Sequence, residues 1–193
     1  MNNQKIKKKH IVKIPKDIIL CYSENHQTVF LKGTMGQKLI KLKVKLKLID
    51  SKKFIVITDQ FFGEVSTKEK KRRKSYQGTC VALIKRTIFE ISKIIFKKLK
   101  LIGVGYKIFK ISYANINLLK LNLGFSHSIY FKIPDNVEII CYKTNKILIS
   151  GNDHQNVTQI AARIRSYKIP EIYKGKGILY ENELIKLKEG KKV

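Results

Sequence analysis

Residues 39–48 read LIKLKVKLKL, the most regular pattern in the chain. Apolar side chains occupy the even positions from Ile40 to Leu48, and lysines occupy the odd positions from Lys41 to Lys47. Successive side chains of a β-strand point to opposite faces, so this alternation predicts one continuous strand with a buried face and a solvated face. The apolar face needs a second layer to cover it, which indicates a fold of sheets covered on one side.

Further strands are expected before and after this stretch. Ile18–Tyr22 and Thr28–Lys32 are apolar, β-branched runs separated by turn-forming residues, which predicts a hairpin. Phe54–Thr58 follows a short polar turn and predicts the next strand. In the second half of the chain, similar runs predict strands at residues 106–111, 116–123, 129–133, 137–142 and 147–150.

A long helix is predicted between these two groups of strands. Apolar residues recur every three or four positions from Cys80 to Leu99, as in an amphipathic helix. We expect this helix to end near residues 90–93, because residues 94–106 are rich enough in β-formers to make a strand. The preceding segment, TKEKKRRKS at residues 67–75, has no apolar residue and predicts either an exposed loop or the first solvated turn of the helix.

A second helix is predicted from Asp153, a good N-cap residue, to about Tyr167. The order of strands followed by a helix thus occurs twice. It predicts an α+β fold of two similar modules in tandem, each a small antiparallel-rich sheet covered by one helix. The expected boundaries are residues 1–10 for a basic leader, 11–96 for the first module, 97–167 for the second, and 168–193 for a basic extension with little core-forming pattern.

The composition favours a polyanionic partner. The 193 residues contain 41 Lys and Arg against 14 Asp and Glu, a formal net charge of +27 at pH 7. The electrostatic field of such a positive chain attracts polyanions and repels copies of the chain. Nucleic acid is therefore the expected partner. Hydrophobic residues at 44% suffice for one or two small cores, which excludes a simple disordered tail. No apolar run approaches the roughly 18 residues of a membrane span.

Patterns that support catalysis or metal binding are missing from the sequence. The three cysteines and four histidines lack the spacing of a zinc site or a disulfide framework. Residues 103–105, GVG, lack the third glycine of a dinucleotide loop, and a bent strand is expected there. Ser126 and His127 are adjacent, so a strand would point them to opposite faces rather than join them as nucleophile and base. We therefore expect no enzymatic activity, no metal and no cofactor.

The sharpest local pattern is PEIYKGKGI at residues 170–178. Its two glycines follow Lys174 and Lys176, an arrangement that lets backbone amides and ammonium groups approach a folded RNA backbone closely. Tyr173 adds a ring that can stack on a base. A flexible charged tail explains these residues equally well. The lysines within residues 41–47 are a weaker candidate, because a polar strand face is more often merely solvated.

The string at residues 170–178 resembles the signature of the L6 family of large-subunit ribosomal proteins. Three further strings occur in the order and spacing of that family: LIGVGY at residues 101–106, LNLGFSH at 121–127, and GNDHQ at 151–155 followed by AARIR at 161–165. The resemblance is strong from Gly78 to Lys192 and weak before it.

The resemblance implies a structural constituent of the ribosome with two tandem α+β domains and no enzymatic activity. It implies binding to large-subunit rRNA near the translation-factor-binding region, close to the sarcin–ricin loop. Neighbouring large-subunit ribosomal proteins and passing translation factors are then further partners, with no small-molecule substrate. By the same resemblance, the rRNA-binding residues are Lys168, Tyr173, Lys174, Gly175, Lys176, Gly177, Arg163 and Arg165.

Two other classes of protein share the basic surface. One is an RNA-processing enzyme, or another RNA-binding module, that works outside the ribosome; the sequence supplies no acid–base or metal constellation for the enzyme. The other is a protein of the membrane surface, which requires a basic amphipathic helix with bulky apolar anchors. The long helix has a basic face, but its apolar stripe is needed for the first core.

The composition also bears on location. The chain has five arginines among its 41 basic residues, many Ile and Asn residues and no Trp, as expected from a very AT-rich gene. Its first residues, MNNQKIKKKH, lack the marks of a transit peptide or a secretory signal. We expect an organelle-encoded mitochondrial protein; a plastid or the cytoplasm of an AT-rich bacterium are the alternatives.

Overall fold

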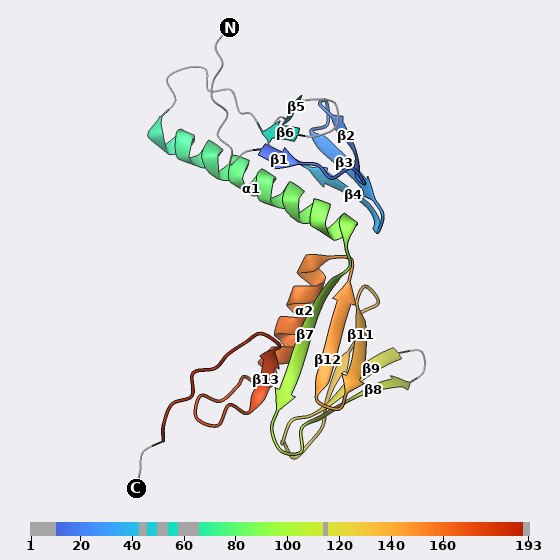
Figure 1. The fold of residues 1–193 in the computed structure, drawn as a ribbon, viewed down its shortest axis with the longest axis vertical. Coiled ribbons are helices and arrows are strands. Elements are labelled where there is room, and N and C mark those ends of the chain that lie inside the picture. Colours follow the sequence, from blue (N-terminus) through green and yellow to red (C-terminus); the bar gives the residue numbers. More distant parts are fainter. Residues whose placement is uncertain (1–10, 43–45, 50–53, 58–65, 114–115, 191–193) are drawn as a thin grey trace. The chain divides into compact units, whose positions relative to one another are not determined.

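The computed structural model describes residues 11–42, 46–49, 54–57, 66–113 and 116–190. The chain divides into two compact units, Met1–Lys93 and Ile94–Val193 (Figure 1). Each unit combines antiparallel sheets with one helix, α1 (Thr67–Ser92) in the first and α2 (His154–Ser166) in the second. The predicted α+β class is therefore confirmed. The division falls a few residues before the expected boundary, because the strand that starts at Ile95 belongs to the second unit.

The first unit contains two three-stranded antiparallel sheets, with the orders β2-β3-β4 and β1-β6-β5. The hairpin predicted from residues 18–32 is confirmed, with Leu20 opposite Leu31 in its register. The strands are β1 (Ile11–Lys13), β2 (Ile19–Ser23), β3 (Thr28–Gly33), β4 (Gly36–Lys41), β5 (Leu46–Ile49) and β6 (Phe54–Ile57).

The prediction of one continuous strand from Leu39 to Leu48 is wrong. β4 ends at Lys41 and pairs with β3, whereas β5 begins at Leu46 and pairs with β6 in the other sheet. Between them the Leu42 amide donates to the carbonyl of Gln27 in the β2–β3 turn (2.8 Å), and residues 43–45 lie outside the described residues. Alternation predicts which side chains are buried, as Leu42 and Leu46 are, but it does not set the strand with which each length of backbone pairs.

Helix α1 covers the core of the first unit with the predicted apolar stripe. Ile84 is fully buried, and Cys80, Ile88 and Ile91 lie in the same cluster as the strand residues Val12, Val29 and Leu31. The helix ends at Ser92, as predicted, where the carbonyl of Ile91 accepts from the Met35 amide (3.0 Å). It begins at Thr67, so residues 67–75 are helical and not a loop.

One buried carboxylate joins α1 to the sheet. Glu90 is buried, and its two oxygens accept from Lys38 of β4 (2.6 Å) and from Arg86 one turn earlier (2.7 Å). Both cations are about one-third exposed, so the pair satisfies the carboxylate without burying two full positive charges.

The second unit contains a three-stranded sheet, β10-β9-β8, and a four-stranded sheet, β11-β12-β7-β13. Helix α2 begins at the predicted N-cap, where the Asp153 carboxylate accepts from the Gln155 amide (3.1 Å). It packs Val157, Ala161 and Ile164 on the second core. The strands are β7 (Ile95–Ile102), β8 (Lys107–Tyr113), β9 (Ile116–Asn122), β10 (Ile129–Lys132), β11 (Glu138–Lys143), β12 (Lys146–Gly151) and β13 (Gly177–Tyr180).

The tail after α2 is more structured than its sequence predicts. Residues 177–180 form β13, which pairs antiparallel with β7, and Ile178 and Leu179 are buried (Figure 1). The prediction of little core-forming pattern after residue 168 is wrong at these positions. These four residues form a strand only because they pair with the edge of β7, which is distant in sequence, so local sequence does not predict the strand.

Sheet order follows one scheme in both units of the described chain. The orders β2-β3-β4 and β1-β6-β5 of the first unit have the counterparts β8-β9-β10 and β7-β12-β11 in the second, and a helix follows in each. β13 then extends the second unit at the free edge of β7. No helix in the described ranges is long and apolar enough to cross a membrane.

Candidate nucleic-acid interface

Residues 168–178, called here the signature loop, connect α2 to β13 and close on themselves. The Ile178 amide donates to the carbonyl of Lys168 (2.9 Å), which joins the two ends of the loop. Inside it, the Glu171 amide donates to Lys176 (3.0 Å), and the Gly175 amide donates back to Glu171 (2.9 Å). The backbone is therefore a hydrogen-bonded loop of defined shape and not an open tail.

The two glycines of the signature loop serve its shape in different ways. Gly175 has φ of +68°, a left-handed conformation that side chains with a Cβ rarely adopt. Gly177 has φ of +152° and is buried, and a Cβ there would lie 2.5 Å from Cα of Pro170. At Gly177 the close approach is thus to the chain's own backbone at the start of the loop.

Cationic and aromatic side chains occupy the outer part of the loop. Tyr173 is 56% exposed, and Lys174 beside it is exposed, while Lys176 is half-buried. At the base of the loop the Lys168 ammonium lies 4.4 Å from the centroid of the Phe125 ring, a cation–π contact. This arrangement presents positive charge and an aromatic ring on one continuous segment.

Two of the strings that carry the family resemblance, residues 101–106 and 121–127, meet in the structure. The Tyr106 ring packs against Gly103 and Gly124, where an added Cβ would lie 2.8 Å and 3.0 Å from ring atoms. Residues 103–105 form the turn between β7 and β8, so the bent strand expected there is instead a connection between two strands.

Sequence reasoning missed a pair of rings beside the signature loop. Phe125 is 42% exposed and stacks on His127, with the ring centroids 5.9 Å apart. Exposed, stacked rings next to cations are suited to contact with unpaired bases. The signal in the sequence was the exposed turn after Gly124, but nothing in it showed that Lys168 would reach the Phe125 ring.

The two arginines of α2 have different surroundings. Arg163 is exposed in the last turn of the helix. Arg165 makes a double contact with Glu183 of the tail, Nε to Oε2 at 3.1 Å and a second nitrogen to Oε1 at 2.5 Å. This hydrogen bonding raises the pKa of Arg165 and lowers the pKa of Glu183. The Tyr180 amide also donates to Glu183 (3.1 Å), so this pair fixes the end of β13.

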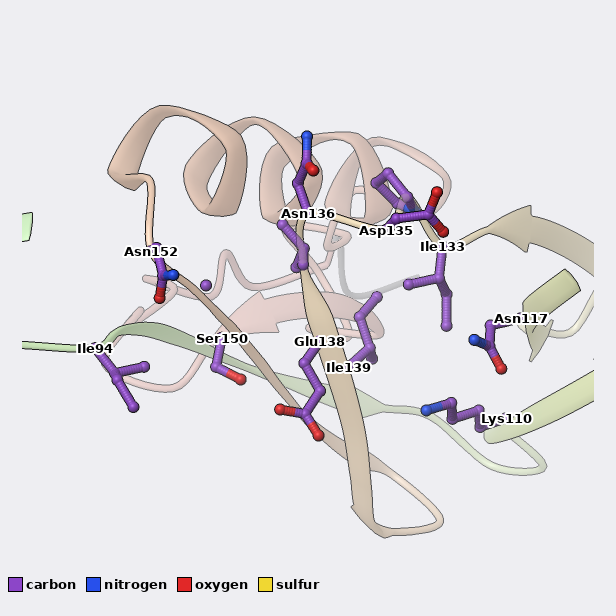
Figure 2. Close-up of a pocket in the computed structure, with 13 residues that line it drawn as sticks. Ile94, Lys110, Asn117, Ile133, Asp135, Asn136, Glu138, Ile139, Ser150 and Asn152 are labelled. Carbon is purple, nitrogen blue, oxygen red and sulfur yellow. The ribbon is translucent and has the colours of Figure 1, made fainter. Parts of the chain in front are cut away.

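A cleft of about 470 Å³ in the second unit has a different character. It is bordered by Lys110 of β8, by the turn before β11 and by the end of β12. Its rim holds two acidic residues, Asp135 and Glu138, whose carboxyl groups point in different directions (Figure 2). In the described residues, no group of three or more His, Cys, Asp or Glu side chains is placed to hold a metal ion.

These features define a strongly basic α+β protein with an ordered, cationic loop at the end of its second sheet. Residues 102–181 match the family Ribosomal protein L6. Three relatives align over most of the chain. The large ribosomal subunit protein uL6m of Reclinomonas americana is 38% identical over 184 residues, which are 94% of this chain and 95% of the relative.

Two bacterial relatives are equally similar. The large ribosomal subunit protein uL6 of Mycoplasma capricolum is 37% identical over 94% of each chain. The corresponding protein of Shewanella woodyi is 37% identical over 87% of this chain and 89% of the relative. The chain therefore belongs to the ribosomal protein L6 family. It is a structural, non-enzymatic ribosomal protein, so the alternative of an RNA-processing enzyme is not supported.

Proposed function

We propose that the chain is an architectural protein of the large ribosomal subunit that binds rRNA through the signature loop and the adjoining end of α2. The observation that carries this proposal is the closed loop itself, whose backbone hydrogen bonds give a defined shape to the segment that carries Tyr173, Lys174 and Lys176. Preorganised cations lose little conformational freedom on binding, which favours contact with a fixed pattern of phosphates.

Each predicted site residue has a place in this proposal. Lys168, Tyr173, Lys174, Lys176 and Arg163 contact the RNA, whereas Gly175 and Gly177 maintain the loop. Arg165 positions the tail through Glu183, because its guanidinium is already occupied by that carboxylate. Phe125 and His127 add a stacking surface beside Lys168.

The test is occupancy of the protein in assembled large subunits. The double variant Lys174→Glu with Lys176→Glu reverses two charges on the loop without adding bulk, and we expect its occupancy to fall. The matched control is Lys97→Glu with Lys110→Glu, two exposed lysines of the same unit outside the loop. Equal occupancy for the two double variants and the wild type would contradict the proposal.

A second measurement examines the electrostatic part of the proposal. Phosphate contacts release counterions, so the affinity of the purified chain for large-subunit rRNA should fall with salt. The slope of log affinity against log salt is about 0.7–0.9 for each phosphate contacted. An affinity that does not change with salt is the opposing result.

The site on the ribosome follows from the family resemblance. We propose that the chain lies near the translation-factor-binding region, close to the sarcin–ricin loop, beside other large-subunit proteins. Cross-linking from a cysteine placed at exposed Lys174 would identify the neighbouring RNA. Cross-links only to RNA distant from that loop would refute the location.

We further propose that the two units are tandem copies of one module, followed by the basic extension of residues 168–193. The matched sheet orders of the two units, each ending in a helix, support this. If the backbone of β1–β6 and α1 fails to superpose on that of β7–β12 and α2 in a crystal structure, the duplication is wrong.

We propose that the protein is encoded and used in a mitochondrion. The excess of Lys over Arg and the many Ile and Asn residues support an AT-rich gene, and one similar relative is mitochondrial. Bacterial relatives are as similar, so composition carries the proposal and similarity does not. A nuclear gene for this chain would refute it.

A further inference from the structure

The first turns of α1 extend beyond the core that the rest of the helix covers. The N-cap of the helix is Ser66, whose hydroxyl accepts from the Glu69 amide (3.4 Å), and the first buried residue of the helix is Gln77. Figure 1 shows the described strands of the first unit beside the later turns of α1. The residues from Thr67 to Ser75 therefore form a helical projection with its own capped start, and Tyr76 after them already packs against the core.

Most residues of this projection are cationic. Its one acidic residue is Glu69, and every cation on it is exposed except Arg73, which is half-buried. We call its six cations the basic turns: Lys68, Lys70, Lys71, Arg72, Arg73 and Lys74.

The change from core to projection occurs within one helical stripe. The buried stripe runs back from Ile91 through Ile84 to Gln77 at spacings of three and four. Continued by the same spacing, it reaches Arg73 and then Lys70. Cations thus occupy even the positions that would face a core, so residues 67–75 supply no apolar side chain to the core of the first unit.

The basic turns also destabilise the helix that carries them. Like charges three and four residues apart repel each other on a helix surface, and cations at a helix N-terminus face the positive end of the helix dipole. A polyanion that binds there removes both penalties. Cations at these successive positions point around the whole helix circumference, which suits a groove with phosphates on both walls better than a flat surface.

We infer that the basic turns are a second RNA-binding surface, which holds the phosphate backbone of a double-helical RNA segment. The surface lies in the first unit and does not depend on the signature loop. Phosphate is favoured over a membrane because residues 67–75 contain no apolar side chain to enter a bilayer. The contact fixes position and carries no sequence readout.

The test compares two six-residue variants of the full chain. In one, all six cations of the basic turns are changed to Gln, which has a good helix propensity. In the matched control, the same number of exposed lysines scattered over the same unit become Gln: Lys13, Lys16, Lys32, Lys41, Lys85 and Lys93. Both variants lose the same charge, so they differ only in where it is lost.

The first readout is affinity for a fully paired RNA hairpin at several salt concentrations. We expect the basic-turn variant to bind about tenfold more weakly than the scattered control and to have a smaller salt slope. Equal losses in the two variants would mean that only net charge matters, and would overturn the inference. The signature-loop variant Lys174→Glu with Lys176→Glu is measured in parallel, so that loss there alone overturns this inference and leaves the proposed function standing.

The second readout is amide hydrogen exchange of the unchanged chain. Binding of the hairpin should slow exchange across residues 67–75 at least severalfold, because these residues pack on no core that would protect their amides. Vesicles of phosphatidylserine are the comparison. Protection of this segment by vesicles and not by RNA would assign the basic turns to a membrane surface and refute the RNA contact.

Discussion

Helices α1 and α2 follow the same scheme of strands, yet one is twice as long as the other. α1 has 26 residues and α2 has 13. The buried residues of α2 run from Val157 to Ile164, and those of α1 run from Gln77 to Ile91. Covering a sheet of this size therefore needs only part of α1. The additional N-terminal turns, residues 67–75, add surface and no apolar side chain to the core.

The two helices also differ in where their charge lies. α2 has its arginines, Arg163 and Arg165, in the last turn, where cations are favourable beside the negative end of the helix dipole. α1 has no basic residue in its last turn and its densest cations at the start. One helix places its charge where it stabilises the fold. In α1 the cations reduce the stability of the helix, which points to a role outside folding.

The largest effects are expected where the two helices are alike. Ile84 of α1 and Ile164 of α2 are both fully buried in their own cores. Changing either to Ala should reduce the free energy of unfolding by about 2–5 kcal/mol, because the cavity refills only in part.

Hydrogen exchange resolved by residue is the measurement for this pair. Ile84→Ala should accelerate exchange in β3 and not in β12, and Ile164→Ala should do the reverse. A loss shared equally by the two units would show that they unfold as one cooperative body, contrary to the separate cores.

A smaller effect is expected at Gly33, where β3 lies close to the end of α1. A Cβ on Gly33 would lie 2.1 Å from Cγ2 of Ile91 and 3.1 Å from the Ile91 carbonyl oxygen. Gly33→Ala should therefore destabilise the first unit by about 1–3 kcal/mol through overpacking. The control is Gly78→Ala on the exposed face of the same helix, where nothing lies within 4 Å.

The control should change stability in the opposite direction. Alanine loses less conformational entropy than glycine in a helix, so Gly78→Ala should stabilise by about 0.5–1 kcal/mol. Urea unfolding of the two variants gives both values. Destabilisation by both substitutions would mean that the two positions do not differ in packing as described.

Local sequence patterns predicted the elements whose partners are near in the chain. The hairpin of β2 and β3 and the capped start of α2 at Asp153 are examples. Periodicity could not predict that residues 39–48 divide between two sheets, since Leu42 and Leu46 are buried in either arrangement. The spacing of Ile91 and Ile95 continues a helical stripe although the second lies in a strand.

The same limit applies to the candidate site. The motif identified Tyr173, Lys174 and the two glycines, because their order along the chain carries the resemblance. It could not predict that Gly177 is required by the Pro170 backbone. Nor could it predict that Arg165 is engaged by Glu183, since these residues become neighbours only after β13 joins the sheet.

The Arg165–Glu183 pair is a pH-dependent contact between α2 and the tail. Hydrogen bonding to Arg165 holds the pKa of Glu183 below its ordinary value. A depressed carboxyl pKa stabilises the folded form above the unfolded pKa of about 4.3, and this stabilisation is lost as the pH falls towards the folded value. The tail should therefore loosen from α2 in acid.

The Tyr180 amide, which donates to Glu183, reports this change. Its proton chemical shift should titrate with a midpoint below the ordinary pKa of a glutamate. Glu183→Gln should abolish the titration while β13 stays paired with β7. A titration that persists in this variant would show that another group controls the end of the strand.

The smallest effect concerns the thermal stability of the chain without RNA, which we expect to rise when six cations are removed. Neutralising the basic turns to Gln removes repulsion between like charges and between cations and the helix dipole. It also removes the hydrogen bond and the cation–π contact from Arg72 to Tyr76, a single exposed contact against the repulsion among six cations. The thermal midpoint of the variant should rise slightly at low salt, and the difference should vanish at high salt because salt screens exposed charges. Arg163→Gln is the control from α2: it removes an exposed cation from a helix C-terminus, so its midpoint should fall slightly. A lower midpoint for the basic-turn variant would mean that these cations stabilise the isolated chain. The different placement of cations on α1 and α2 would then be explained by folding and not by a partner.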